Sequence, residues 1–444
     1  MKNAILKLGA VVATTALATS PALAAPAADA AAAVAADAVS GGTAYIFNTL
    51  LFLIGGFLVM WMAAGFAMLE AGLVRAKNTS TQCLKNIGLY SIAGLMFWII
   101  GYNIAYPGDF NGYIGGFSGW YPMQDVGAAD LETGYSVASD WFFQMVFCAT
   151  TASIVSGTLA ERIKIVPFFI FVTVLTGVIY PVVVSWEWGG GFLDQMDFSD
   201  FAGSTLVHST GGWAALIGAI ILGPRLGRYV DGKVNVFPGT NIPLATLGTF
   251  ILWLGWFGFN GASQLAMGTV GDVSDVSKIF VNTNMAACAG VVTAIILTQL
   301  RYGKADVTMA LNGALAGLVS ITAEPLMPSV GTSIIIGAIG GLIVVFTVPL
   351  LDKLKIDDVV GAIPVHLFAG IWGTLAVAIS YPEILGAQVA GIVATAVWVS
   401  VASGIVWIVL KMTMGLRPSE EVEIAGLDIH ETGVEAYPDL AHKA

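Results

Sequence analysis

The sequence predicts an all-α polytopic membrane protein with eleven transmembrane helices, arranged as an inverted five-plus-five repeat with one extra helix. Three observations predict it: the composition, the apolar runs and a nine-residue pattern that occurs twice. Of 444 residues, 57% are hydrophobic and only 11% are charged, against about 25% charged in ordinary soluble domains. The net charge of −11 leaves no excess of basic residues for binding nucleic acid. The composition excludes a soluble enzyme, a disordered chain and a nucleic-acid binder.

Residues 1–24 have the layout of a secretory signal peptide. Lys2 and Lys7 precede an apolar stretch, and Ala22-Leu23-Ala24 is a small-residue cleavage site. Residues 25–43 are rich in Ala, and we interpret them as an exposed leader. Cleavage would leave the mature N-terminus outside the membrane.

Eleven apolar runs follow, each long enough to cross a hydrocarbon core of about 30 Å. They lie near residues 46–74, 86–106, 139–160, 165–185, 203–222, 242–262, 279–300, 308–323, 332–350, 359–381 and 388–412. We therefore expect a transmembrane domain over 44–412 and a cytoplasmic tail over 413–444. An odd number of spans puts the C-terminus inside. Fifteen of the sixteen Lys and Arg residues after the leader then lie inside, as the positive-inside rule expects. This predicts a multi-pass membrane protein with its N-terminus outside and its C-terminus inside.

The pattern D-x-x-G-x-x-x-V-H occurs at Asp200–His208 and again at Asp358–His366. The first copy opens a span from outside and the second opens a span from inside, which is typical of an inverted repeat. A weaker match joins Gly65-Phe66 to Gly258-Phe259, and chance would explain that one.

Each repeated His lies eight residues, or about 12 Å, inside its span. His208 and His366 should therefore meet near the middle of the membrane, where an ionisable residue is a functional hypothesis by default. Two adjacent imidazoles can pass a proton, since each has a donor and an acceptor nitrogen. The alternative is two unrelated core histidines. A helix cap and a functional role explain Asp358 equally well. For Asp200 we favour a functional role, as the counter-charge for an entering cation.

Aromatic residues gather at the outer ends of the spans. Phe143 and Phe147 are four residues apart and share a helix face, and Trp188 follows the next span. These rings are explained either by an interfacial aromatic belt or by a cage for a small cation. The Cys residues, three in number, sit singly in apolar runs with no zinc-ligand spacing, so we expect neither a metal nor a cofactor.

Several motifs resemble the ammonium transporter family (Amt/Mep/Rh), in its bacterial Amt branch. They are G-F-A-M-L-E-A-G at 65–72, F-F-Q-M-V-F at 142–147, S-G-T-L-A-E-R at 156–162, W-G-G-G at 188–191, D-F-A-G-S-T-L-V-H at 200–208, G-W-F-G-F-N-G at 255–261 and V-H-L-F-A-G-I-W-G at 365–373. The resemblance covers essentially everything after the leader.

The resemblance implies a role for each matching residue. Phe143, Phe147, Trp188 and Ser263 would form an external ammonium site. Phe147 and Phe259 would stack as a gate, and Asp200 would support deprotonation of the cation. His208, His366 and Trp256 would line the pore and relay the proton.

The resemblance also implies the partners. The expected substrate is ammonium or ammonia, with methylammonium as an analogue. A homotrimer in the lipid membrane is expected, and a PII-type signal protein on the cytoplasmic face is implied by the resemblance alone. Two departures stand out: Gly261-Ala262 where A-G is usual, and Leu367-Phe368 after His366, which we expect to narrow the inner pore.

The sequence thus predicts a transporter and not an enzyme. Ammonium is recruited outside and deprotonated, ammonia crosses a hydrophobic pore, and the proton crosses separately. Three alternatives stay open: a Rh-like neutral gas channel, an ammonium sensor, and a haem protein with His208 and His366 as axial ligands.

Overall fold

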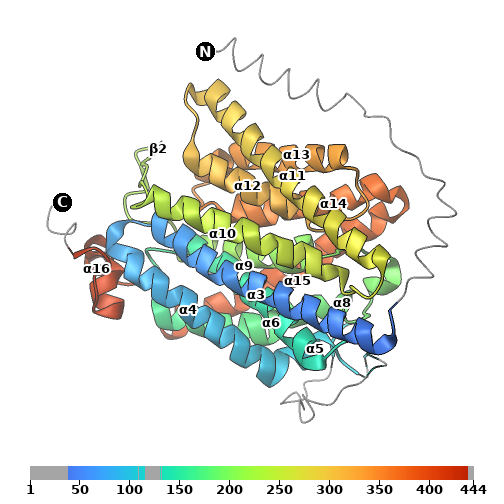
Figure 1. Cartoon of the computed structure of the whole chain (residues 1–444). Coiled ribbons are helices and arrows are strands. Elements are labelled where there is room, and N and C mark those ends of the chain that lie inside the picture. Colours follow the sequence, from blue (N-terminus) through green and yellow to red (C-terminus); the bar gives the residue numbers. More distant parts are fainter. Residues whose placement is uncertain (1–38, 109, 116–130, 132, 439–444) are drawn as a thin grey trace.

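The computed structural model describes residues 39–108, 110–115, 131 and 133–438, and these form a bundle of helices (Figure 1). The first half of the bundle contains α3 (Gly41–Leu73), α4 (Thr79–Met96), α5 (Tyr102–Ala105), α6 (Val137–Thr158), α7 (Ile165–Val174), α8 (Tyr180–Trp186) and α9 (Thr210–Leu222). The second half contains α10 (Ile242–Gly261), α11 (Val270–Tyr302), α12 (Val307–Ile321), α13 (Val330–Lys353) and α14 (Ala369–Ser380), followed by α15 (Leu385–Thr413) and α16 (Glu420–Ala425).

Short irregular helices complete the spans and the turns between them. π-Helical segments are η2 (Phe97–Gly101), η3 (Leu175–Ile179), η5 (Ser204–Ser209), η7 (Ile363–Phe368) and η9 (Asp428–Thr432). The 3₁₀ turns are η1 (Ala76–Asn78), η4 (Asp194–Met196), η6 (Ala262–Gln264) and η8 (Pro382–Ile384). Strands β1 (Tyr229–Val230) and β2 (Lys233–Val234) pair antiparallel, with Tyr229 opposite Val234.

The predicted fold class is confirmed: this is an all-helical, multi-pass membrane protein. Within the described residues, nine helices are long and apolar enough to cross a membrane. The two other predicted runs also form helices: α12 is apolar but only 15 residues long, and α6 spans 22 residues. Polar and charged side chains such as Asp140 and Gln144 make α6 less apolar, and it is buried along most of its length. Every predicted run is thus a helix, and the total of eleven membrane crossings stays a prediction.

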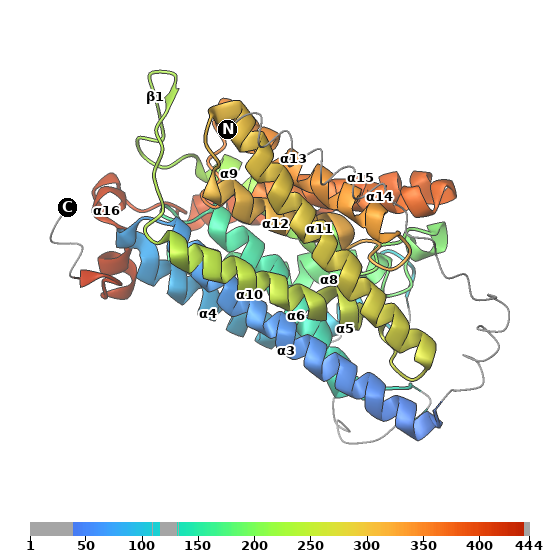
Figure 2. The ribbon, with the colours of Figure 1, turned by 45° about the horizontal axis from the view of Figure 1, so that its top comes forward.

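The first helices of the two halves, α3 and α10, lie side by side along much of their length (Figures 1 and 2). Glycines allow this close approach. A Cβ atom on Gly248 would lie 2.4 Å from the backbone nitrogen of Leu69, and one on Gly65 would lie 2.9 Å from that of Leu252. Helices in membranes associate through such small residues, because lipid gives no hydrophobic drive for helix pairing.

The two copies of the repeated pattern adopt the same local structure. Gly203 and Gly361 have φ values of 105° and 81°, a conformation that favours glycine. Each glycine turns the chain into a π-helical segment, η5 after Gly203 and η7 shortly after Gly361. The sequence predicted the repeat and the helices, but it gave no sign of π-helical geometry.

The C-terminal segment packs against one end of the bundle, which we name the tail end. Figure 2 shows α16 and the β1–β2 hairpin at this end, with the start of α3 at the other. The Asp428 carboxylate accepts hydrogen bonds from the backbone N–H groups of Ser80 and Thr81. Glu423 forms a two-point ion pair with Arg417 and accepts a hydrogen bond from the Leu226 N–H. The tail is therefore folded onto the first turn of α4 and the loop after α9.

The predicted signal peptide lies outside the described residues, as does most of the predicted leader. The final residues of that leader are helical, since α3 begins at Gly41. The Ser40 side chain accepts a hydrogen bond from the Thr43 N–H and caps the helix there.

Candidate functional site

The structure brings the two repeated histidines into contact at the centre of the bundle. Their Nδ1 atoms lie 3.2 Å apart, and the ring planes meet at 28°. His208 is 0% exposed and His366 is 2% exposed. A hydrogen bond between two Nδ1 atoms requires one to carry a proton and the other to be free.

Rings from the opposite half of the repeat flank each histidine. Trp256 and Phe259, both on α10, stack on His208 at centroid distances of 5.0 and 5.2 Å. Phe66, on α3, lies 6.1 Å from His366. The weaker match between Gly65-Phe66 and Gly258-Phe259 therefore marks equivalent positions, and each half places a phenylalanine against the histidine of the other half.

The aromatic rings continue from His208 away from the tail end. Phe259 stacks on Phe147 at 4.0 Å and 20°. Phe147 contacts Phe143 at 4.8 Å and Trp188 at 6.0 Å, both edge to face. Phe143, Phe147 and Phe259 are each at most 1% exposed, so the stacked pair fills the space between Trp188 and the histidines.

Ser263 lies in η6, directly after α10, and is partly exposed. Its hydroxyl donates a hydrogen bond to the Phe259 carbonyl oxygen at 2.7 Å, which leaves oxygen lone pairs free to accept from a ligand. The neighbouring departure from the family pattern is matched by packing. A Cβ on Gly261 would lie 2.2 Å from the Phe280 ring, while Ala262 fills the space beside Gly55.

The carboxylate of Asp200 is fully buried and points at the backbone. One oxygen accepts from the N–H groups of Gly203 and Ser204, and the other from those of Thr205 and Leu206, at 2.7–3.0 Å. The indole N–H of Trp188 donates to the Asp200 carbonyl oxygen at 3.1 Å. Asp200 therefore caps η5 and ties the aromatic loop to it.

Asp358 has the same capping position in the second copy. It accepts from the Ile363 N–H at 2.7 Å and from the Thr158 hydroxyl at 3.0 Å. The structure thus favours the capping interpretation for Asp358. Asp200 is a helix cap as well, with four backbone N–H donors.

Sequence reasoning missed Glu187, which adjoins Trp188. Its Oε1 accepts from the Asp200 N–H at 2.7 Å, and its buried Oε2 has no partner among the described residues. Burial, and then the nearby Asp200 carboxylate, raise the pKa of Glu187 well above its usual value. One Glu in an aromatic loop gave no sequence signal for this.

The expected narrowing of the inner pore by Leu367 and Phe368 is not observed. Leu367 packs on α9, where a Cβ on Gly212 would lie 2.7 Å from the Leu367 Cβ. Phe368 packs against the same hydrophobic cluster. Neither residue is among those that line the cavity beside His366.

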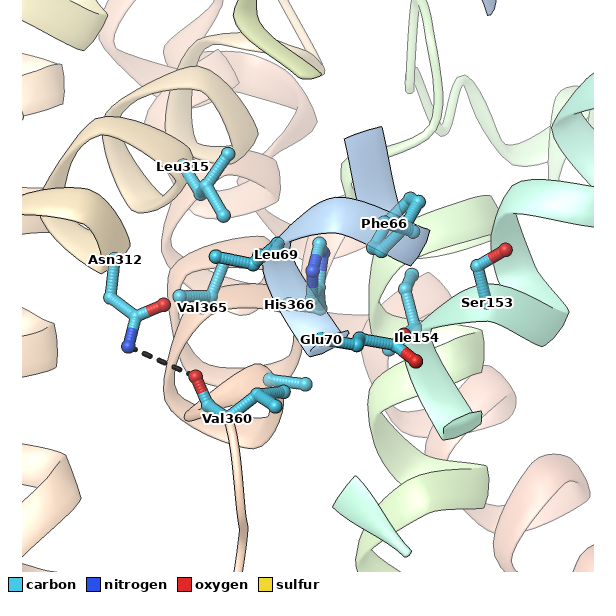
Figure 3. A pocket seen from close by; sticks show the side chains of 11 residues that line it. Phe66, Leu69, Glu70, Ser153, Ile154, Asn312, Leu315, Val360, Val365 and His366 are labelled. Atoms are coloured by element: carbon cyan, nitrogen blue, oxygen red, sulfur yellow. Dashed lines mark hydrogen bonds between the residues drawn. The ribbon is translucent and has the colours of Figure 1, made fainter. Parts of the chain in front are cut away.

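That cavity lies on the tail side of the histidines and is small, with about 10 Å³ available to the centre of a water-sized molecule (Figure 3). Its lining residues are Phe66, Leu69, Glu70, Ser153, Ile154, Asn312, Leu315, Val360, Ala362, Val365 and His366. Sequence reasoning missed the cavity, because its walls come from distant segments of the chain.

The histidine contact also bears on the haem alternative. His208 and His366 would hold a haem only if the space between their rings were open for it. The two rings instead touch each other at 3.2 Å, with Trp256 and Phe259 stacked on His208. The described residues contain no group of three or more His, Cys, Asp or Glu side chains that could hold a metal ion.

Together, the multi-pass helical fold and the apolar path broken by one histidine pair define a membrane transport protein for a small substrate. Comparison with known proteins identifies the family. Residues 50–437 match the model of the Ammonium Transporter Family, and the chain belongs to this family.

Individual relatives agree with this assignment. The chain is 42% identical over 423 residues to "Ammonium transporter Amt2" of Archaeoglobus fulgidus, covering 87% of each sequence. Among solved structures, "Sensor Amt Protein" gives a TM-score of 0.83 at 34% identity, covering 88% of this chain and 100% of that one. Mep2 of Candida albicans gives 0.76 at 26% identity, covering 86% and 89%.

Proposed function

We propose that this transporter recruits ammonium at Phe143, Phe147, Trp188 and Ser263, removes one proton, and conducts ammonia past the histidine pair while the proton crosses separately. The observation that carries this proposal is the unbroken series of ring contacts from Trp188 through Phe147 and Phe259 to His208. At the inner end of this series, the imidazole nitrogens of His208 and His366 face each other.

The physical reason for deprotonation is the closed aromatic path. An ion in such surroundings keeps no hydration shell, and its desolvation costs several kcal/mol even after relaxation. The faces of aromatic rings offset about 0.5–2 kcal/mol of this cost. Neutral ammonia avoids most of it, so the path favours ammonia over any cation.

The histidine pair supplies the second path. The Nδ1 contact at 3.2 Å is a hydrogen bond along which one proton can move. Each neutral ring carries one proton, so a relay also needs a proton to enter at Nε2 of the donor ring and one to leave from Nε2 of the acceptor ring. After that coupled transfer the two rings have exchanged tautomers. Trp256 holds its position beside His208 by donating its indole N–H to the Thr322 hydroxyl at 2.8 Å.

We further propose that the tail end faces the cytoplasm and that the aromatic end faces the periplasm of a bacterial inner membrane. The concentration of Lys and Arg at the tail end supports this orientation. The signal peptide (1–24), the transmembrane domain (44–412), the homotrimer and a PII-type partner on the tail remain parts of the same proposal.

The test is a current measurement on proteoliposomes adsorbed to a solid-supported membrane. A pulse of ammonium should give a saturable current of positive charge, and methylammonium a smaller one. Lumenal alkalinisation without current would instead indicate a neutral gas channel.

A sensing role is the second candidate, and the similarity to the protein titled "Sensor Amt Protein" favours considering it. A sensor would bind ammonium with little flux. Saturable ammonium binding, together with an ammonium current no larger than that of empty liposomes, would support the sensor and contradict transport.

A further inference from the structure

Glu70 is a buried carboxylate that the transport path described above does not use. It lies on α3, four residues after Phe66, and is 1% exposed. Residues four apart on a helix are neighbours, about 5–6 Å apart. Since Phe66 contacts His366, Glu70 lies about one helical turn from the histidine pair, toward the tail end.

The two oxygens of Glu70 have different surroundings. Oε2 accepts hydrogen bonds from the side chains of Gln82, Asn86 and Ser156, the latter two at 2.8 and 2.9 Å. Among the described residues, none donates a hydrogen bond to Oε1. Three donors thus fix the carboxylate through one oxygen and leave the other available.

The available oxygen belongs to a residue that lines the cavity next to His366. In Figure 3, Glu70 and Phe66 project from the same stretch of α3, and the His366 side chain lies between α3 and the wall formed by Val365. The cavity has polar groups in its wall and leaves about 10 Å³ for the centre of a water-sized molecule, roughly what a single water or ammonia molecule needs. Glu70 and His366 therefore share one small chamber.

Lys85 lies near Glu70 and offsets its negative charge, but it donates no hydrogen bond to the Glu70 carboxylate. Lys85 is 1% exposed, and its ammonium group donates to the Ser156 carbonyl oxygen at 2.8 Å and to the Gln82 amide oxygen at 3.3 Å. Both partners also belong to residues that bind Oε2 of Glu70. A buried charge without a partner is costly. The positive charge of Lys85 reduces this cost for the Glu70 carboxylate from a distance, while Oε1 of Glu70 stays unpaired.

We propose that Glu70 is the proton acceptor on the cytoplasmic side, and that the cavity it shares with His366 is where ammonia regains its proton. This inference rests on the proposed function, in which ammonia and the proton cross separately. The Glu70 carboxylate takes the proton released from His366, directly or through one water molecule in the cavity. An O–H bond forms at Oε1 as the N–H bond of the imidazole breaks.

The second step returns Glu70 to its starting state. The lone pair of ammonia takes the proton from Oε1, so ammonium forms and the carboxylate becomes an anion again. One proton and one ammonia enter the chamber, and one ammonium ion leaves it toward the tail end. The positive charge of Lys85 repels the new ammonium ion, so the Glu70 carboxylate binds ammonium more weakly and releases it.

The experiment uses the full-length protein in proteoliposomes containing a pH-sensitive dye. Ammonium pulses are applied to the wild type, to Glu70→Gln, which keeps the shape but carries no exchangeable acid, and to Glu70→Asp. Glu324→Gln is the matched control, because Glu324 is also a buried carboxylate but lies away from the cavity and binds the Leu326 and Met327 N–H groups.

In Glu70→Gln we expect the current to fall at least tenfold while ammonia still enters, so that the lumen becomes alkaline. Glu70→Asp should retain part of the current, and Glu324→Gln should stay within twofold of the wild type. A merely structural role would abolish current and ammonia entry together, and that result in an assembled Glu70→Gln protein overturns the inference, as does a normal current. A wild type without current overturns the separate-crossing mechanism itself.

Discussion

At the scale of single residues, the histidine contact sets the chemistry of the centre. The Nδ1–Nδ1 distance of 3.2 Å requires unlike tautomers, so His208 and His366 are nonequivalent although the repeat makes their positions alike. The Nε2 atom of His208 has no protein partner among the described residues.

Replacing either histidine by Leu tests whether the pair works as one unit. Leu fills a similar volume but removes both nitrogens. If the proton passes through both rings, His208→Leu and His366→Leu should each lose the ammonium current as fully as the double variant, since residues acting as a unit are non-additive. Currents from the three variants check this.

The control for the histidine variants is assembly, because a buried imidazole can also be structural. Each variant must migrate as the wild-type oligomer. Partial losses that add up in the double variant would mean that the rings only line the pore. A normal ammonium-selective current in an assembled His366→Leu protein would rule out the relay.

Asp200→Asn should lose most of the transport activity, and Asp200→Ala nearly all of it. A side-chain amide keeps one accepting oxygen but turns an NH₂ group toward two of the four backbone N–H groups that Asp200 binds. Two donors then face each other, at a cost of about 1–3 kcal/mol for the unsatisfied groups.

Transport and thermal unfolding should be measured together on Asp200→Asn. An unchanged unfolding temperature with lost transport would assign Asp200 an electrostatic role. Full activity would contradict the prediction and leave Asp200 as a helix cap only.

At the scale of elements, the sequence predicted the helices well because lipid makes their pattern simple. A span needs about 20 apolar residues, and each predicted run is helical in the structure. The duplicated D-x-x-G-x-x-x-V-H pattern also predicted that His208 and His366 meet. The π-helical form of η5 and η7 was not predictable, since an apolar run that can cross a membrane has the same composition in an α-helix and in a π-helix.

The loop between α13 and η7 is held by an ion-pair network at the tail end. Asp357 forms a two-point pair with Arg225 at 2.8 and 2.9 Å, and Arg225 also meets Glu161 at 3.3 Å. Burial alone would raise the pKa of Asp357, but the Arg225 guanidinium holds it well below its usual value.

The sign of this shift gives a pH prediction. An aspartate with a depressed pKa in the folded state stabilises the fold above its unfolded pKa of about 3.9. That contribution is lost as the pH falls below about 4, toward the folded pKa. The contribution of Asp357 to the unfolding temperature in detergent should therefore be constant from pH 5 to 8. In stronger acid that contribution is lost, and the unfolding temperature should fall.

Asp357→Asn should lower the free energy of unfolding by about 3 kcal/mol near neutral pH, because the buried Arg225 loses one of the negative charges that it pairs with. The variant should also lose part of the acid dependence. An unfolding temperature equal to that of the wild type at pH 7 would contradict this assignment.

The tail is held to the membrane domain by Asp428, whose carboxylate caps the first turn of α4. Asp428→Ala removes both hydrogen bonds and should cost about 1 kcal/mol, as other helix caps do. We expect limited proteolysis to cut the tail about fivefold faster, roughly the factor that 1 kcal/mol implies. Glu420→Ala, which changes an exposed carboxylate on α16, should be cut at the wild-type rate.

At the scale of the whole molecule, the two halves complete each other's sites. α3 of the first half places Phe66 beside His366, and α10 of the second half places Phe259 beside His208. The sequence predicted the paired histidines, but the exchange of flanking rings depends on the packing of α3 against α10. Glu70 was hidden for the same reason: it lies within the G-F-A-M-L-E-A-G motif, and only the fold places it next to His366.

The last prediction concerns selectivity against potassium, which resembles ammonium in size and charge but has no proton to release. Cation–π contacts offset about 0.5–2 kcal/mol, whereas the idealised cost of moving an ion into surroundings of low dielectric constant is of order 20 kcal/mol. The aromatic rings therefore cannot carry an intact cation past the stacked Phe147 and Phe259. Potassium pulses should give less than about a hundredth of the ammonium current, even though potassium in excess competes for the outer site. A potassium current comparable to that of ammonium would show that ions cross whole, and deprotonation would then not be the source of selectivity.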